Sequence, residues 1–98
     1  MLSQFYYLLR SKADGSYLVA RLDKKESPPK NASYLLIFNE SFDALSYLNT
    51  HGSDIRENFA VESIAGTQLK NLLQRWGFQG VGIVQEPIIP KIDFLALI

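Results

Sequence analysis

The stretch YLLIFNESFDALSYLNTHG, which runs from Tyr34 to Gly52, decides the fold of this chain. The residues from Tyr34 to Phe38 are all apolar, and a run of this length suits a strand that is covered on both faces. Asn39 breaks the run, and its side-chain amide can accept hydrogen bonds from the first turn of a helix. The stretch therefore predicts a buried strand that leads directly into a helix.

The predicted helix has a buried face and favourable charges at its ends. The expected core positions recur at near-helical spacing: Phe42, Ala44, Leu45 and Leu48. Glu40 and Asp43 place negative charge at the positive end of the helix dipole, and His51 lies near the negative end. Gly52 is expected to adopt the left-handed backbone that ends a helix.

Length and composition indicate a single globular domain, residues 1–98, of which 47% is hydrophobic and 20% charged. Ten basic and ten acidic residues cancel, so no net charge attracts nucleic acid or an anionic membrane. The absence of cysteine excludes disulfides and thiol catalysis. No apolar run is long enough to span a membrane, and Phe5 to Leu9 is too short for a signal peptide, so a cytoplasmic location is expected.

The residues before the central stretch predict two strands and a loop. Phe5–Leu9 and Tyr17–Leu22 are rich in aromatic and branched side chains, and Asp14-Gly15 between them is a strong hairpin signal. The polar run Asp23–Ser33 contains two prolines, which cannot donate ladder hydrogen bonds, so it is expected to be a loop.

The residues after the central stretch predict a second strand–helix pair and further strands. Phe59–Ala65 is expected to be a strand, Gly66 to open a helix and Gly77 to end it. The apolar face of this helix has the spacing i, i+3, i+4 and i+7: Leu69, Leu72, Leu73 and Trp76. Val81–Gln85 predicts a strand in which Gly80 and Gly82 allow close backbone approach, and the tail Ile92–Ile98 is apolar.

Together these elements predict an α+β fold. The expected sheet is mixed or antiparallel, has five or six strands and carries two helices packed on one face. The order is β-β-β-α-β-α-β, with or without a final strand.

This pattern resembles the SseB-like N-terminal domain. The residues that carry the resemblance are Phe38-Asn39-Glu40-Ser41-Phe42, Gly66-Thr67 through Trp76, and Gly80 to Val84. The resemblance spans most of residues 5–86. It implies a small α+β fold with no assigned catalytic residues and points to protein interaction or an auxiliary role.

Few residues suggest catalysis or metal binding. His51 could act as a general base or pH switch, but its position before Gly52 favours a solvated residue at a helix end. Asp54 and Glu57 lie near His51 without the spacing of a metal site. Trp76 could stack on a ligand, but its helical register favours the core. No catalytic residue, cofactor or metal is therefore assigned.

The C-terminal segment is the predicted interface. Its candidate contact residues are Ile88, Ile89, Ile92, Phe94, Leu95 and Leu97. Chain ends are usually polar, and a small core has little room for so many apolar side chains, so an apolar patch or an open strand edge is expected to receive a second copy. The alternative is the last strand of a monomer.

The resulting hypothesis is a non-catalytic protein-interaction module, homodimeric or with another protein partner, that binds neither nucleic acid nor membrane. The alternative is a small-ligand-binding protein or enzyme, with a site built from isolated Tyr, Asp and Glu residues near His51. Surface tyrosines are enriched at binding sites, although cross-strand packing is the commoner use. The tyrosines considered are Tyr6, Tyr7, Tyr17, Tyr34 and Tyr47.

Overall fold

The computed structural model describes residues 4–24 and 30–96 and has the predicted α+β fold. The strands are β1 (Phe5–Ser11), β2 (Val19–Lys24), β3 (Lys30–Phe38), β4 (Phe59–Ala65), β5 (Gly80–Glu86) and β6 (Lys91–Ala96). The helices in these ranges are α1 (Ser41–His51), the short 3₁₀ helix η1 (Arg56–Asn58) and α2 (Gly66–Trp76). The predicted order of elements is confirmed, and β6 is the final strand.

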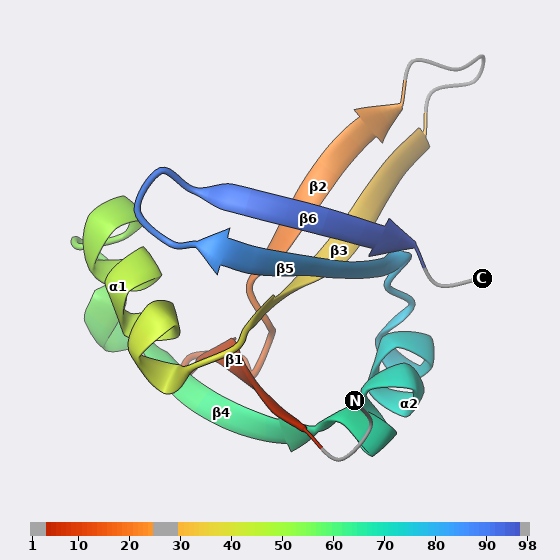
Figure 1. Ribbon diagram of the computed structural model, residues 1–98, viewed down its shortest axis with the longest axis horizontal. Helices are drawn as coiled ribbons and strands as arrows, with labels where there is room; N and C mark the ends of the chain where they lie inside the picture. Colours follow the sequence, from red (N-terminus) through yellow and green to blue (C-terminus); the bar gives the residue numbers. More distant parts are fainter. Residues whose placement is uncertain (1–3, 25–29, 97–98) are drawn as a thin grey trace.

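Strand β3 is the centre of a mixed six-stranded sheet with the order β4-β1-β3-β5-β6. It runs parallel to β5 from Tyr34 to Phe38, and its first half pairs antiparallel with β2. Strand β1 pairs with β3 where its Tyr7 lies opposite Phe38, the last residue of β3. It pairs with β4 along the whole length of both strands. As Figure 1 shows, β2 and the first half of β3 extend beyond the hairpin of β5 and β6.

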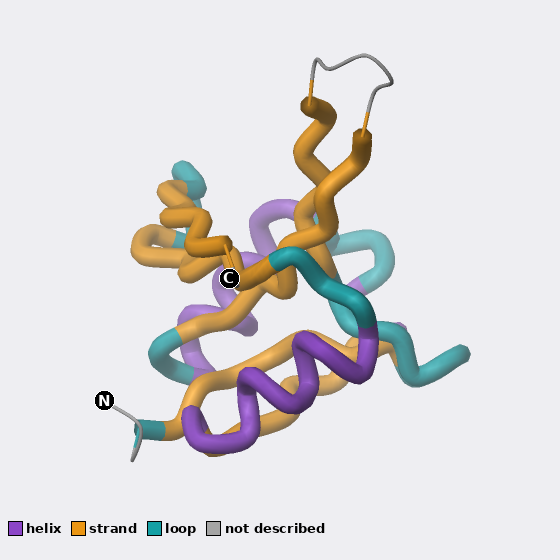
Figure 2. Tube along the Cα trace, turned by 90° about the vertical axis from the view of Figure 1, so that its right-hand side faces the viewer, coloured by secondary structure: helices purple, strands orange, loops and turns teal. Residues whose placement is uncertain are grey.

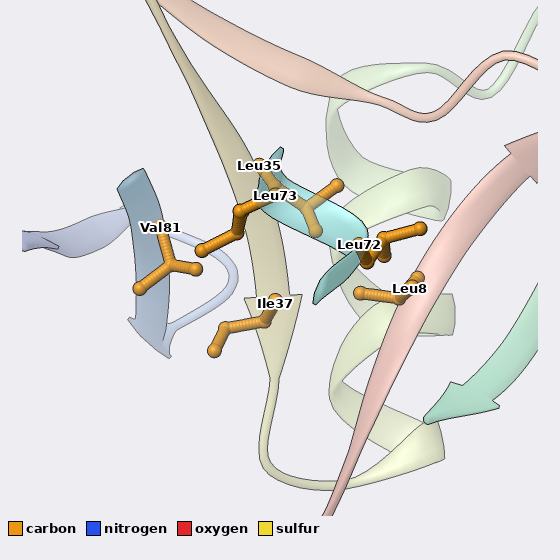
Figure 3. Close-up of a cluster of buried hydrophobic side chains, with 6 residues drawn as sticks. All are labelled: Leu8, Leu35, Ile37, Leu72, Leu73 and Val81. Atoms are coloured by element: carbon orange, nitrogen blue, oxygen red, sulfur yellow. The ribbon is translucent and has the colours of Figure 1, made fainter. Parts of the chain in front are cut away.

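The two α-helices cover opposite faces of this sheet. One buried cluster, the α2-side cluster, joins the sheet to α2 and consists of Leu8, Leu35, Ile37, Leu72, Leu73 and Val81 (Figure 3). The other, the α1-side cluster, joins the sheet to α1 and consists of Leu9, Leu36, Phe38, Ala44, Leu48 and Val84. Neighbouring residues of a strand point to opposite faces, so Leu35 and Leu36 mark different sides. Figures 1 and 2 show the helices apart, with strands between them.

The expectation of two helices on one face is therefore wrong. The reason lies in β3, where all five residues from Tyr34 to Phe38 are buried and require cover on both sides. The prediction that this run is covered on both faces is confirmed.

The predicted hairpin between the first two strands forms only at its tip. The Ser11 amide donates to the Ser16 carbonyl at 2.7 Å, and Gly15 has a φ of 75°. Beyond this turn the two segments share a single bridge, between Arg10 and Tyr17. Strand β1 pairs instead with β4 and β3, because Leu8 and Leu9 are both fully buried and such a strand belongs inside the sheet.

Both ends of the loop predicted from Asp23 to Ser33 are strand instead. Strand β2 continues to Lys24 and β3 begins at Lys30, with Asp23 opposite Asn31. The ladder can extend this far because both prolines of the run fall between the paired positions. Residues 25–29 of the predicted loop lie outside the described residues.

Helix α1 buries only part of the stripe that was expected to face the core. Ala44 and Leu48 are buried, and Tyr47 packs on Phe38 with ring centroids 5.5 Å apart. Phe42 is 74% exposed and Leu45 is also exposed. The half-buried Tyr47 lies beside Ala44 and Leu48 in place of the expected Phe42 and Leu45.

Helix α1 ends before Gly52 as predicted, but the predicted cap at Asn39 and the predicted left-handed backbone of Gly52 are wrong. Glu40 precedes the helix, without a side-chain hydrogen bond, and its carbonyl accepts from the amides of Asp43 and Ala44. Asn39 is thus one residue too early to be the N-cap. Gly52 donates its amide to the Leu48 carbonyl at 2.8 Å but has a φ of −146° and a ψ of 39°, which is not the left-handed conformation.

Helix α2 agrees with its sequence pattern in its bounds and most of its buried face. Leu72 and Leu73 are buried, Gly77 has a φ of 73°, and the Phe78 amide donates to the Leu73 carbonyl at 2.9 Å. Trp76 is the exception, because it is exposed and packs edge-on against Tyr17. Its expected place in the core is wrong.

The buried face of α2 leads to a first prediction about stability. We expect Leu72→Ala to lower the free energy of unfolding by about 2–5 kcal/mol, because it leaves a cavity in the α2-side cluster. Lys70→Ala changes an exposed side chain of the same helix and should cost well below about 1 kcal/mol. Urea unfolding of both variants is the measurement, and similar midpoints would refute the assignment of the buried face.

Two glycines allow β6 to approach the sheet, as predicted. A Cβ on Gly80 would overlap the carbonyl oxygen of Leu95. A Cβ on Gly82 would lie 3.0 Å from the Leu36 side chain and 3.1 Å from that of Phe94. Because Gly80 and Gly82 have no side chains, β6 lies close to β5. Phe94 and Ile92 of β6 can therefore contact side chains of β3 and β5.

Candidate functional site

The predicted interface residues lie along the hairpin of β5 and β6. Ile88 and Ile89 occupy its turn and are 60% and 78% exposed. Phe94 and Leu95 lie on β6 and are 38% and 54% exposed. Ile92 packs against the α1-side cluster, so it contributes to the core more than to the surface. Leu97 lies outside the described residues.

Strand β6 presents apolar side chains on both faces of an outer strand. Phe94 packs edge-on against Tyr34, with ring centroids 5.4 Å apart, on the face that α1 partly covers. Leu95 points to the other face, where it lines a hollow of about 230 Å³ with Leu69 and Leu73 of α2. Since β6 ends the strand order, its outer edge has no partner among the described strands.

His51 connects α1 to the same hairpin. Its Nε2 lies 2.9 Å from the Pro87 carbonyl oxygen and must donate, because a carbonyl oxygen only accepts. The imidazole also lies against Tyr47, with centroids 4.7 Å apart. His51 is exposed at the end of α1, as expected, and this hydrogen bond also connects it to the turn that carries Ile88 and Ile89.

The surroundings of His51 are mainly apolar. A cavity of about 120 Å³ beside it is lined by Leu18, Tyr47, Leu48, His51, Gly52, Ile55 and Phe59. Burial raises the pKa of Tyr47. Glu40 and Asp43 do not line this cavity, which is smaller than the usual 300–1,000 Å³ of small-ligand sites. In residues 4–24 and 30–96, no group of three His, Cys, Asp or Glu side chains could hold a metal ion.

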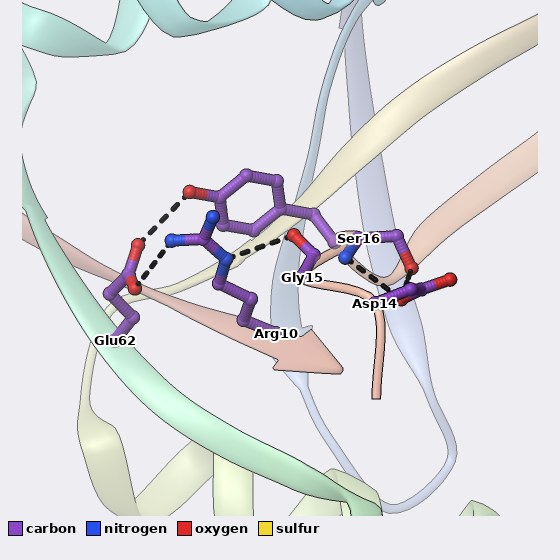
Figure 4. A network of polar contacts seen from close by, with 6 residues as sticks. Arg10, Asp14, Gly15, Ser16 and Glu62 are labelled. Atoms are coloured by element: carbon purple, nitrogen blue, oxygen red, sulfur yellow. Dashed lines mark hydrogen bonds and ion pairs between the residues drawn. The ribbon is translucent and has the colours of Figure 1, made fainter. Parts of the chain in front are cut away.

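The main polar network lies on the other side of the molecule and surrounds Glu62 (Figure 4). One carboxylate oxygen of Glu62 accepts from the Tyr17 hydroxyl at 3.0 Å, and the other accepts from Arg10 Nη1 at 3.2 Å. Arg10 Nε also donates to the Gly15 carbonyl at 2.9 Å, and the guanidinium lies 5.0 Å from the centre of the Tyr17 ring. The network thereby joins the turn after β1 to β4.

Hydrogen bonding and burial also set the pKa directions in this region. Burial raises the pKa of Tyr17, and its hydrogen bond to Glu62 raises it further, while the charges of Arg10 and Arg75 oppose the rise. The phenol is therefore protonated at neutral pH and acts as a donor. In the nearby turn, the amide and hydroxyl of Ser16 donate to Asp14 and hold the pKa of that carboxyl below its usual range.

A cleft of about 380 Å³ opens beside this network, between β4 and α2. Its lining residues are Tyr17, Glu62, Ser63, Ile64, Gln68, Asn71, Leu72 and Arg75. Gln68, Asn71 and Arg75 follow one another at helical spacing along α2. They are exposed, as the polar side of this helix was expected to be, and they form one wall of the cleft.

This cleft was not foreseen from the sequence. The ion pair beside it joins Arg10 of β1 to Glu62 of β4. These two residues are 52 positions apart, and the pairing of their strands was not predicted. The polar stripe on α2 was the available signal, but a polar stripe usually only faces water. Of the tyrosines considered, Tyr34 is buried and the other four are half-buried. Tyr17 is the tyrosine that lines this cleft.

The fold and these surfaces define a small α+β protein with a mixed six-stranded sheet between two helices. Comparison with protein-family models, with curated protein sequences and with solved structures found no match. Neither α1 nor α2, nor any other helix of the described ranges, has the length and apolar character needed to cross a membrane.

Proposed function

We propose that this chain is a non-catalytic protein-interaction module that pairs with a second copy through β6 and the turn before it. The exposed apolar side chains on this outer strand, above all Phe94 and Leu95, are the observation that supports the proposal. An open edge offers backbone hydrogen bonds, and exposed apolar side chains beside it favour burial against a partner. The resemblance to the SseB-like N-terminal domain points to the same class of role, and we place the protein in the cytoplasm.

A second copy fits this edge because the strand can pair with itself. Two β6 strands related by a two-fold axis perpendicular to the sheet would run antiparallel and continue the sheet. Residues that face each other would then lie on the same face. A two-fold axis at Asp93 opposes two carboxylates, which is unfavourable, whereas an axis at Phe94 opposes two aromatic rings. We therefore propose pairing centred on Phe94.

The two faces of the edge differ in a way that agrees with this register. Phe94 shares its face with Ile92 and Ala96, which carry no charge. Lys91 and Asp93 lie on the other face with Leu95, where they keep the edge soluble before a partner is bound. In this register the exposed part of Phe94 is buried against its own copy, and Asp93 lies opposite Leu95 on the other face and not opposite a second carboxylate.

The test is the mass of the full chain by light scattering at high micromolar concentration. We expect a dimer for the unchanged chain and for Phe42→Asp, in which an exposed phenylalanine on α1 is changed. Phe94→Asp should be monomeric, because the pairing then opposes two buried carboxylates. Leu95→Asp changes the other face and should weaken association less.

Point variants are preferred to a chain that ends at Glu86. Removing β6 would expose Val81 and Val84 of β5 and delete Ile92, which packs in the core. A monomeric full chain would refute the proposal. A dimer that survives Phe94→Asp and dissociates with Phe42→Asp would move the interface to α1.

A further inference from the structure

We propose that the cleft between β4 and α2 is a binding site for a carboxylate-bearing ligand, held by Arg75 and by the side-chain amides of Gln68 and Asn71. The site is separate from β6 and does not depend on self-association. It rests on the lining of the cleft, on the charges around it and on its size.

The charges around the cleft leave one cation for a ligand. Both oxygens of Glu62 already accept hydrogen bonds, one from Tyr17 and one from Arg10, so the acidic group of the cleft is neutralised from within (Figure 4). Arg75 lines the same cleft and forms no ion pair with any side chain described in residues 4–21 and 33–96. Its guanidinium is the unmatched charge, and it favours an anion.

The groups beside Arg75 favour a carboxylate in particular. A guanidinium presents parallel N–H donors that match the two oxygens of a carboxylate. Asn71 lies one turn and Gln68 two turns before Arg75 on the same helix, and each can supply two amide N–H donors. The two oxygens of a carboxylate can accept more hydrogen bonds than one guanidinium donates to them. The side-chain amides of Gln68 and Asn71 can supply the remaining donors.

The rest of the cleft suits the carbon skeleton of such a ligand. Ile64 and Leu72 provide apolar wall, and the Tyr17 ring forms another side. The volume of about 380 Å³ falls in the range of small-ligand sites. A free dicarboxylate and an acidic peptide side chain both have this chemistry, and the two sources can be distinguished by experiment.

The experiment is a proton–nitrogen NMR titration at pH 7 with ionic strength held constant by sodium chloride. The ligands are succinate, its neutral analogue succinamide and a terminally blocked acidic tetrapeptide. We expect saturable shifts of the Gln68 and Asn71 side-chain amides and of Arg75 Nε–H with succinate or the peptide, and none with succinamide. Shifts with the peptide alone would identify a protein segment as the source, and shifts with succinate a free small acid.

Two matched variants test the role of Arg75. Arg75→Gln keeps donors and most of the length but removes the charge, and should weaken binding roughly tenfold or more. Arg56→Gln changes an exposed arginine that donates to Asn49 outside the cleft, and should leave binding unchanged. Equal shifts with succinamide, undiminished binding by Arg75→Gln, equal loss in both variants, or no shifts with either acid would overturn the proposal. The backbone spectrum of Arg75→Gln shows in the same titration that the variant is folded.

Discussion

Replacing Phe38 by alanine should lower the free energy of unfolding by about 3–5 kcal/mol. Phe38 has no exposed surface, ends the central strand and packs against Tyr47 of α1 with centroids 5.5 Å apart. It also marks the point at which β1 joins β3. The ring therefore connects the sheet to α1, and its removal leaves a cavity that neither element can fill by itself. Urea unfolding at equilibrium measures the loss.

The matched control is Phe42→Ala, four residues further on. Its ring is 74% exposed, so we expect a change within about 0.5 kcal/mol. The sequence pattern placed both phenylalanines in the core, and only the structure separates them. A loss of several kcal/mol for Phe42→Ala, or a small one for Phe38→Ala, would contradict the observed orientation of α1.

The elements that the sequence predicted well are those set by local chemistry. Residues 59–65 form the expected strand, α2 has its expected first and last residues, and Gly77 adopts the left-handed backbone. Period, glycine and cap signals act over a few residues, so one sequence is enough to read them. The run Tyr34–Phe38 was likewise predicted as a doubly covered strand from its unbroken apolar character.

The pairing of strands could not be predicted in the same way. A turn at Asp14-Gly15 suggested a hairpin, and the turn is present, but β1 pairs with β4 some fifty positions later, as in Ser11 opposite Phe59. Which strand a given edge selects depends on the burial of both faces across the whole sheet. Leu8 and Leu9 are adjacent, and both are fully buried, which was the available sign that β1 lies inside the sheet.

The two candidate surfaces differ in the same way, because one follows from a local sequence pattern and the other from long-range contacts. The C-terminal segment stood out in the sequence because many apolar residues lie close together in it, and four of them, Ile88, Ile89, Phe94 and Leu95, are exposed. The cleft at Arg75 depends on residues from three separate segments and on a network that occupies Glu62. No spacing in the sequence connects those groups, because they meet only when the segment at Tyr17, β4 and α2 are assembled.

The placement of the helices on opposite faces has a second consequence that can be measured. Leu35→Ala and Leu36→Ala should each lower the free energy of unfolding by about 2–5 kcal/mol, although the two residues are adjacent. Both side chains are buried, Leu35 with α2 and Leu36 with α1. If both helices lay on one face, one of these substitutions would be close to neutral. Leu45→Ala, an exposed leucine of α1, is the matched control and should cost well below about 1 kcal/mol.

Amide chemical shifts of the two variants show which helix each leucine supports. Leu35→Ala should perturb the amides around Leu72 and Leu73, and Leu36→Ala those around Ala44 and Leu48, because each cavity opens toward its own cluster. The same helix responding to both substitutions would contradict the two-sided sheet, whatever the size of the stability change. Responses of different helices, together with equal losses in the free energy of unfolding, require a central strand that is packed on both faces. The reason is that the side chains of Leu35 and Leu36 project in opposite directions.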